Sequence, residues 1–115
     1  MTRLQIKRAY EPHDRGDGHR VLVDRLWPRG LRKEDLKDAL WLKEIAPSTE
    51  LRRWFAHRPE RWPEFRRRYW AELDKIPETV AKLRSLTAKG RATLLYSARD
   101  TEHNQAVALR DYLES

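Results

Sequence analysis

The stretch from Val21 to Gly30 most constrains the fold, because it begins as a buried strand and ends as a charged turn. Its first three residues are apolar and mostly β-branched, which favours a strand inside a sheet. Pro28 cannot donate a ladder hydrogen bond and Gly30 permits a positive φ, so the strand, expected at about 20–26, must stop here. The turn delivers four side chains to one edge of the protein: Asp24, Arg25, Trp27 and Arg29.

Two further segments have the hydrophobic pattern of strands. Residues 4–10 alternate apolar and polar positions, and residues 92–97 form an apolar run. Strands that alternate with helical segments predict an α/β fold: a small, mainly parallel β-sheet of about three to four strands, covered by helices, in a single Rossmann-like domain over residues 1–115. Right-handed crossovers bring the carboxyl ends of such strands to one edge. We therefore expect the strands at 20–26 and 92–98 to end side by side.

Helices are predicted from periodicity and from capping residues. Ser48 is a suitable N-cap, and Pro47 before it ends a segment, 41–46, that fits either a short strand or the continuation of a helix. Pro77 should kink or split a long helical segment, and Asp100 should cap the last helix. The predicted helical segments are 31–40, 49–58, 60–89 and about 101–113.

The charge of the chain is unevenly distributed. Lys and Arg number 25 against 18 Asp and Glu, a net charge of +7. The excess lies in residues 1–33, with nine basic and four acidic residues, and in residues 50–68, with seven and three. Such asymmetry indicates an anionic partner, either a phosphate, a nucleotide or nucleic acid, although a basic surface can also serve solubility alone.

The composition also excludes several classes of site. The chain contains no cysteine, which excludes disulfides, thiol nucleophiles and thiolate metal sites and fits a reducing cytoplasm. No run approaches the ~20 apolar residues that span a bilayer, so no membrane association is expected. His13 and His19 flank two acids in the first loop without the ligand spacing of a known metal site. We expect no metal and no other cofactor.

A second strand exit also carries polar side chains that could do chemistry. They are Ser97, Arg99, Asp100, His103 and Asn104. Ligands of open α/β sheets bind outside the carboxyl ends of the strands, and the N–H groups that open a helix at about 101 would face an anion there. Guanidinium groups hold phosphate or carboxylate bidentately. Arg25, Arg29 and Arg99 are therefore the candidate anion ligands.

The other candidates have less certain roles. Trp27 would wall the site or stack on a base, and Ser97 and Asn104 complete the ligand-binding set. Asp24, with Asp100 or His103, is the candidate for general acid–base catalysis. Structural ion pairs are the alternative: Asp24 could hold Arg99 or Arg25 as scaffolding, and Asp100 could act only as a cap.

Three functions stay open at this point. The first is an anion-binding α/β domain, with or without enzyme activity on a nucleotide or a nucleic-acid component. The second is a nucleic-acid-binding accessory or regulatory protein that uses the basic surface of residues 50–68. The third is a structural or partner-binding homodimer with an exposed Trp62 or Trp70 at its seam.

Several motifs together resemble the YeaO-like family, a branch of domain-of-unknown-function family 488. They are Asp24–Gly30, Trp41–Lys43, Ala46–Ser48, Leu51–Phe55 with His57, the aromatic residues Trp62, Phe65 and Tyr69, and Leu94–Asp100 with His103 and Asn104. The resemblance covers about residues 3–114 and implies a small cytoplasmic α/β domain without an established biochemical role. Some relatives carry a cysteine after the last strand; this chain has none, so the resemblance implies no thiol chemistry here. Arg99 stands where the resemblance leads us to expect lysine.

Overall fold

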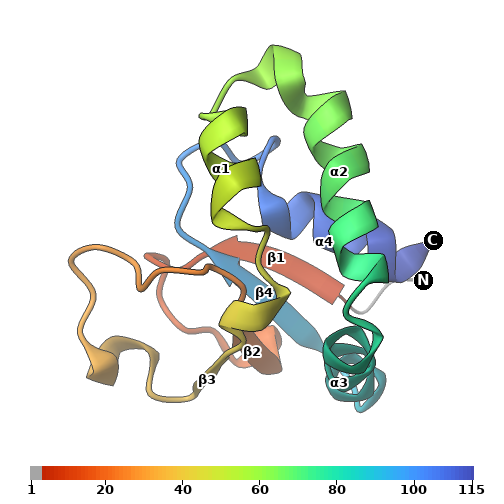
Figure 1. The fold of residues 1–115 in the computed structure, drawn as a ribbon. Helices are drawn as coiled ribbons and strands as arrows, with labels where there is room; N and C mark the ends of the chain where they lie inside the picture. Colours follow the sequence, from red (N-terminus) through yellow and green to blue (C-terminus); the bar gives the residue numbers. More distant parts are fainter. Residues whose placement is uncertain (1–3) are drawn as a thin grey trace.

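The computed structural model describes residues 4–115, and its centre is a four-stranded sheet (Figure 1). The strands are β1 (Leu4–Arg8), β2 (His19–Leu22), β3 (Ala39–Trp41) and β4 (Ala92–Tyr96), in the spatial order β1-β4-β2-β3. All three pairings are parallel, so the four carboxyl ends point the same way. β4 is buried at every position, as expected for a central strand. The predicted α/β class with a small parallel sheet is confirmed.

Four helices accompany the sheet: α1 (Thr49–Phe55), α2 (Trp62–Asp74), α3 (Pro77–Ala88) and α4 (Gln105–Glu114). The Ser48 hydroxyl accepts the Leu51 N–H at 3.1 Å, which confirms Ser48 as the N-cap of α1. Pro77 opens α3, where its missing N–H costs nothing, so the long helical segment is split there as predicted.

The helix predicted at 31–40 is wrong. This segment forms only one 3-10 turn, Lys33–Leu36, and then enters β3, whose register pairs Arg20 with Ala39. Leu36 is buried after that single turn, so a longer helix is not needed to cover the sheet. The ambiguous segment 41–46 ends the strand and continues as a second 3-10 turn, Lys43–Ile45. Strand pairing here outweighs local propensity.

The start of the last helix was also predicted wrongly. α4 begins at Gln105, not at 101, and its N-cap is Asn104, whose Oδ1 accepts the Val107 N–H at 3.0 Å. Asp100 instead closes the turn before the helix, where one carboxylate oxygen accepts the N–H groups of Glu102 and His103. An Asx turn and a helix cap use the same side-chain chemistry, so the local sequence fits both.

The helices cover only one face of the sheet. The buried side chains of all four belong to one apolar cluster with the inward-facing residues of β2 and β4, such as Val21 and Leu94. The opposite face is covered by irregular chain, and a smaller cluster forms there from Ala9, Leu22, Leu36 and Leu95. A Rossmann-like fold has helices on both faces, so that part of the prediction is not confirmed.

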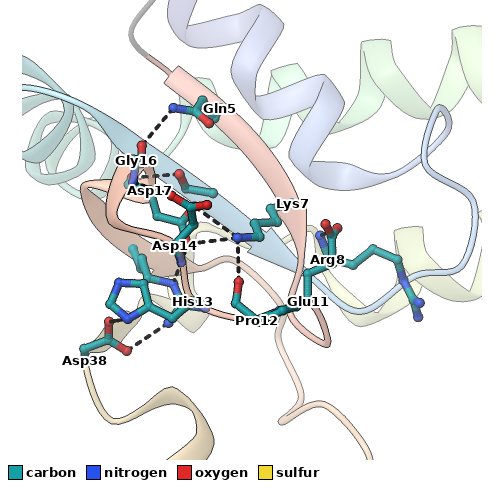
Figure 2. A network of polar contacts seen from close by, with 12 residues as sticks. Gln5, Lys7, Arg8, Glu11, Pro12, His13, Asp14, Gly16, Asp17 and Asp38 are labelled. Carbon is teal, nitrogen blue, oxygen red and sulfur yellow. Dashed lines mark hydrogen bonds and ion pairs between the residues drawn. The ribbon is translucent and has the colours of Figure 1, made fainter.

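A polar network ties the loop after β1 to this second face (Figure 2). The Asp17 carboxylate, only 3% exposed, accepts the Lys7 Nζ at 3.1 Å with both oxygens and lies 3.4 Å from the Arg20 Nε. Arg20 in turn donates to Asp38 at 2.9 Å. A Cβ at Gly18 would lie 2.2 Å from the carbonyl oxygen of Arg91, and the φ of Gly18 is +65°, so only glycine fits beside this network.

Candidate functional site

The edge at which the parallel strands end is hollowed into a cleft of about 780 Å³. The register pairs Leu22 with Leu95, and two further residues along each chain bring Asp24 beside Ser97. The turn after β2, the segment after β4 and helix α1 form its walls. All nine predicted site residues line this one cleft: Asp24, Arg25, Trp27, Arg29, Ser97, Arg99, Asp100, His103 and Asn104.

Asp24 is the most unusual of these residues. Its side chain lines the cleft, yet the residue is only 6% exposed. One oxygen, Oδ1, accepts the side-chain amide of Gln105, whereas the other, Oδ2, is buried without a hydrogen-bond partner. Burial raises the pKa of Asp24, and the nearby Ser97, Gln105 and Arg52 lower it without overcoming that effect. The proposed scaffold pairs with Arg25 or Arg99 do not form in the described chain.

Replacing Asp24 with asparagine is expected to stabilise the protein at pH 7 by about 1 kcal/mol, because it removes a poorly partnered buried charge. The raised pKa means that the folded state favours the protonated carboxyl. The stability that Asp24 contributes is therefore complete below its unfolded pKa of about 4 and is lost as the pH rises through its folded pKa. The advantage of the variant should vanish near pH 3 in urea unfolding curves; a loss of stability at pH 7 would contradict this account.

Asp100 and His103 form a hydrogen-bonded pair in the lining of the cleft. The Asp100 Oδ2 lies 3.0 Å from the His103 Nδ1, and the imidazole packs edge-on against Trp62. The pKa of Asp100 is lowered, chiefly by the Glu102 N–H and also by the N–H and ring of His103, against a smaller effect of burial. Asp100 is therefore an ionised group that orients the imidazole. Both residues lie before α4, although the prediction of a helix from about 101 places His103 in its first turn.

Four arginines of the cleft have guanidinium groups with no ion pair or hydrogen bond in residues 4–115: Arg29, Arg52, Arg53 and Arg99. All four residues are exposed. The lining as a whole contains five arginines and two aspartates, so its net charge is positive. A concave surface with this excess of cations focuses a positive potential on whatever enters it.

Three other side chains that were predicted to bind the ligand already make hydrogen bonds within the protein. Arg25 donates to the carbonyl oxygens of Pro47 at 3.1 Å and Ala46 at 2.9 Å, so it positions the chain that leads into α1. The amide of Asn104 caps α4 and donates to the Asp100 carbonyl, and the residue is 2% exposed. Trp27 donates to the Leu31 carbonyl and packs edge-on against another indole. These three build the walls of the cleft.

Helix α1 also contributes to the cleft, which was not predicted from the sequence. Arg52, Arg53 and His57 line the cleft from this helix and its C-terminal turn. Ala56 and His57 have positive φ angles of 50° and 56°, a conformation that costs non-glycine residues about 1–3 kcal/mol each and that concentrates at functional sites. The basic composition of residues 50–68 was the available signal, but it was assigned as a whole to a nucleic-acid surface.

The structure divides that basic segment in two. The arginines of α2 are partnered away from the cleft: Arg67 and then Arg68 bind Glu64 and lower its pKa to about 2, and Arg66 lies 3.3 Å from Asp111. Arg61 donates to the carbonyl of Trp54. Arg67 and Arg68 therefore form ordinary surface ion pairs with Glu64.

The tryptophans expected at a dimer seam pack on their own chain. Trp62 stacks on Phe65 at a centroid distance of 5.6 Å. Trp70 donates to the Ala108 carbonyl at 3.0 Å, and its ring meets Tyr112 and the guanidinium of Arg66. Both are half-buried at the margin of the helical cluster, so neither is as exposed as the homodimer prediction assumed.

Within residues 4–115, no three or more His, Cys, Asp or Glu side chains gather closely enough to hold a metal ion. No helix in the described part of the chain is both long and apolar enough to cross a membrane.

Comparison with known proteins places the chain in a family. A family model described as "Inactive DUF488-N3 subclade" matches residues 3–115. The chain belongs to this DUF488 subclade. The uncharacterized protein YeaO of Escherichia coli K12 is 46% identical over 112 residues, which cover 97% of each chain. The uncharacterized protein Rv3073c of Mycobacterium tuberculosis H37Rv is 44% identical over 112 residues, 97% of this chain and 94% of that protein.

The resemblance to a YeaO-like DUF488 branch is thereby confirmed. No solved structure matches the chain. The DUF488 assignment covers the whole cleft, from the turn after β2 to the start of α4.

Proposed function

We propose that this DUF488 protein binds a small phosphorylated molecule in the cleft at the carboxyl ends of its strands. The observation that carries the proposal is the set of four unpaired guanidinium groups, Arg29, Arg52, Arg53 and Arg99, around one hollow. Arginine matches phosphate oxygens with several parallel N–H donors. Arginines that served only to solubilise the protein would have no need to gather around a concave surface.

Binding without catalysis fits this cleft best. The family description contains the word "inactive", and the chain has no cysteine that could act as a nucleophile. Asp100 is held ionised by two N–H groups and a histidine, which suits an orienting group better than a proton donor. The acid–base role considered for Asp24, Asp100 and His103 therefore gives way to a binding role.

A nucleic-acid surface on residues 50–68 has less support. The unpaired cations of that segment face the cleft, and the arginines of α2 are partnered within the protein. Neutralisation of many phosphates would need free cations spread along an exposed surface. A shallow dependence of affinity on salt concentration is expected for the small ligand that we propose.

The test is calorimetric titration with inorganic phosphate and adenosine 5′-monophosphate. Arg52→Gln and Arg99→Gln are each expected to weaken binding about tenfold or more, the equivalent of one charge-assisted hydrogen bond of roughly 1.5–3 kcal/mol. Arg67→Gln is the matched control, because Arg67 is also exposed but pairs with Glu64 and does not line the cleft. Unaltered binding by the two cleft variants, or an equal loss in the control, would refute the site.

A further inference from the structure

Arg8, the last residue of β1, binds the chain that leaves β4 with its guanidinium group. Its Nε donates to the Ala98 carbonyl at 3.0 Å, and its Nη2 donates to the Ser97 carbonyl at 3.1 Å. These two carbonyl groups immediately precede Arg99, which lines the cleft. Figure 2 shows the Arg8 side chain extending away from the polar network of Asp17. The contact therefore supports the cleft edge of the sheet and not that network.

The same guanidinium group also supports the turn after β2, through Tyr10. Its central carbon lies 4.8 Å from the centre of the Tyr10 ring, which is a cation–π contact. The Tyr10 hydroxyl donates to the Arg29 carbonyl at 2.8 Å. Tyr10 lines the cleft, whereas Arg8 does not. One side chain of β1 thus supports both backbone segments that carry Arg29 and Arg99.

Both segments have left the sheet where their arginines stand. β2 ends at Leu22 and β4 ends at Tyr96, so Arg29 and Arg99 lie on irregular chain. A ligand that must first order loose chain loses affinity to that ordering, and a contact that fixes the chain beforehand removes the cost. A contact that holds the backbone beside both arginines therefore pre-organises them for a ligand.

The geometry of the contact requires arginine. The planar guanidinium group presents its donors in a fixed fork, so it can bind two neighbouring carbonyl oxygens while its face lies on an aromatic ring. Arg8→Lys would keep the positive charge near the cleft but would lose the fork. The effect of the charge and the effect of the grip on the backbone can therefore be separated.

We infer that Arg8 is a positioning residue of the cleft, which holds Arg29 and Arg99 in place as phosphate ligands. The inference rests on the proposed function, because the ligand is the phosphate group considered there. Arg8 is outside the lining and acts through the backbone of the two segments. Arg52 on α1 is independent of Arg8, because Arg25 positions the chain that leads into that helix.

The first experiment is calorimetric titration of Arg8→Lys with adenosine 5′-monophosphate. The variant is expected to bind about fivefold more weakly than the parent although it keeps the charge, and Arg8→Gln should lose at least as much. Urea unfolding establishes that each variant is folded under the conditions of the titration. Parental affinity in Arg8→Lys would overturn the inference, since charge would then be the whole contribution of Arg8.

The matched control is Arg84→Lys. Arg84 has the same chemistry outside the cleft: it donates to the Leu113 carbonyl at 2.8 Å and lies over the ring of Tyr112. This variant should bind the nucleotide as the parent does. An equal loss in the control would show that the effect of Arg8→Lys is general and not specific to the cleft, and the inference would fail.

A double-mutant cycle tests which arginine Arg8 acts through. In the background of Arg99→Gln, Arg8→Lys should weaken binding further by less than about twofold, because one of the groups that it positions is gone. In the background of Arg52→Gln, Arg8→Lys should keep its full effect. A purely structural role predicts the same loss in both backgrounds, and that result would contradict the inference.

Amide hydrogen exchange tests the contact without any ligand. The amides of Arg29, Gly30 and residues 97–99 should exchange faster in Arg8→Lys than in the parent, whereas those of α3 should not change. Parental exchange rates at these positions would reject the positioning role, whether or not phosphate binds. If the parent binds neither inorganic phosphate nor adenosine 5′-monophosphate, the proposed function fails, and the exchange rates alone decide whether Arg8 holds the two segments.

Discussion

Replacing Asp17 with asparagine is expected to lower the free energy of unfolding by about 3–5 kcal/mol, the usual cost of removing one partner from a buried ion pair. The carboxylate is 3% exposed and neutralises Lys7 and Arg20, whose side chains are 15% and 2% exposed. Without it, two cations stay buried against the second face of the sheet. Since small domains are stable by only about 5–15 kcal/mol, the effect should be plain in urea unfolding.

The pH dependence gives an independent check on Asp17. Burial by itself raises the pKa of this carboxyl group, but the Asp14 N–H, the hydrogen bond from Lys7 and the charges of Lys7 and Arg20 together leave the pKa below its ordinary value. Its contribution to stability is therefore complete above the unfolded pKa of about 4 and is lost as the pH falls through the folded pKa. The gap between parent and variant should shrink only in acid.

A control for this experiment is Glu34→Gln. Glu34 is 75% exposed and its nearest cation lies 3.9 Å away, so the loss of its charge should change stability by less than about 0.5 kcal/mol. A loss of the same size in both variants would show that net charge, and not the buried network, carries the effect.

The second large effect is expected at Glu72. Its carboxylate on α2 accepts the Ser48 N–H at 2.8 Å and the Ser48 hydroxyl at 2.6 Å, and the same hydroxyl caps α1. Glu72→Ala removes both charge-assisted bonds and should cost about 2 kcal/mol of unfolding free energy. Because α1 carries Arg52 and Arg53, the variant should also bind phosphate less tightly than the parent.

Glu44→Ala is the matched control for Glu72. Glu44 is an exposed acid on the same approach to α1, in the turn Lys43–Ile45, and its carboxylate has no partner in residues 4–115. Its removal should change neither stability nor binding. Should Glu72→Ala unfold at the same urea concentration as the parent, the anchoring role of Ser48 and Glu72 would be rejected.

Three of the four strands and the position of the cleft were predictable because their signals are local, whereas β3 and the order of the strands were not. An apolar run such as 92–97 indicates a strand, Pro28 and Gly30 mark where another ends, and parallel strands end at one edge. Those rules suffice to bring Asp24 and Ser97 together without any knowledge of the helices.

The rest depended on contacts between distant parts of the chain. Both Asp100 and Asn104 have cap chemistry, and the choice follows from where the chain leaves β4 and where α4 must pack. Leu31–Leu40 has helical periodicity, but its last residues, Ala39 and Leu40, pair with β2 and form a strand. The side of α1 that meets the cleft is set by Leu51 and Phe55, which are buried in the helical cluster and leave Arg52 and Arg53 outside it.

The strand order has a consequence for how the protein is made. β1 and β2 do not pair with each other; both pair with β4, which comes more than 60 residues after β2. A ribosome therefore releases the first half of the chain long before the strand that joins its pieces exists. Contacts of such wide sequence separation slow folding. Until residue 96 emerges, the edges of β1 and β2 that β4 will cover are unpaired, and they can pair wrongly with other copies of the chain.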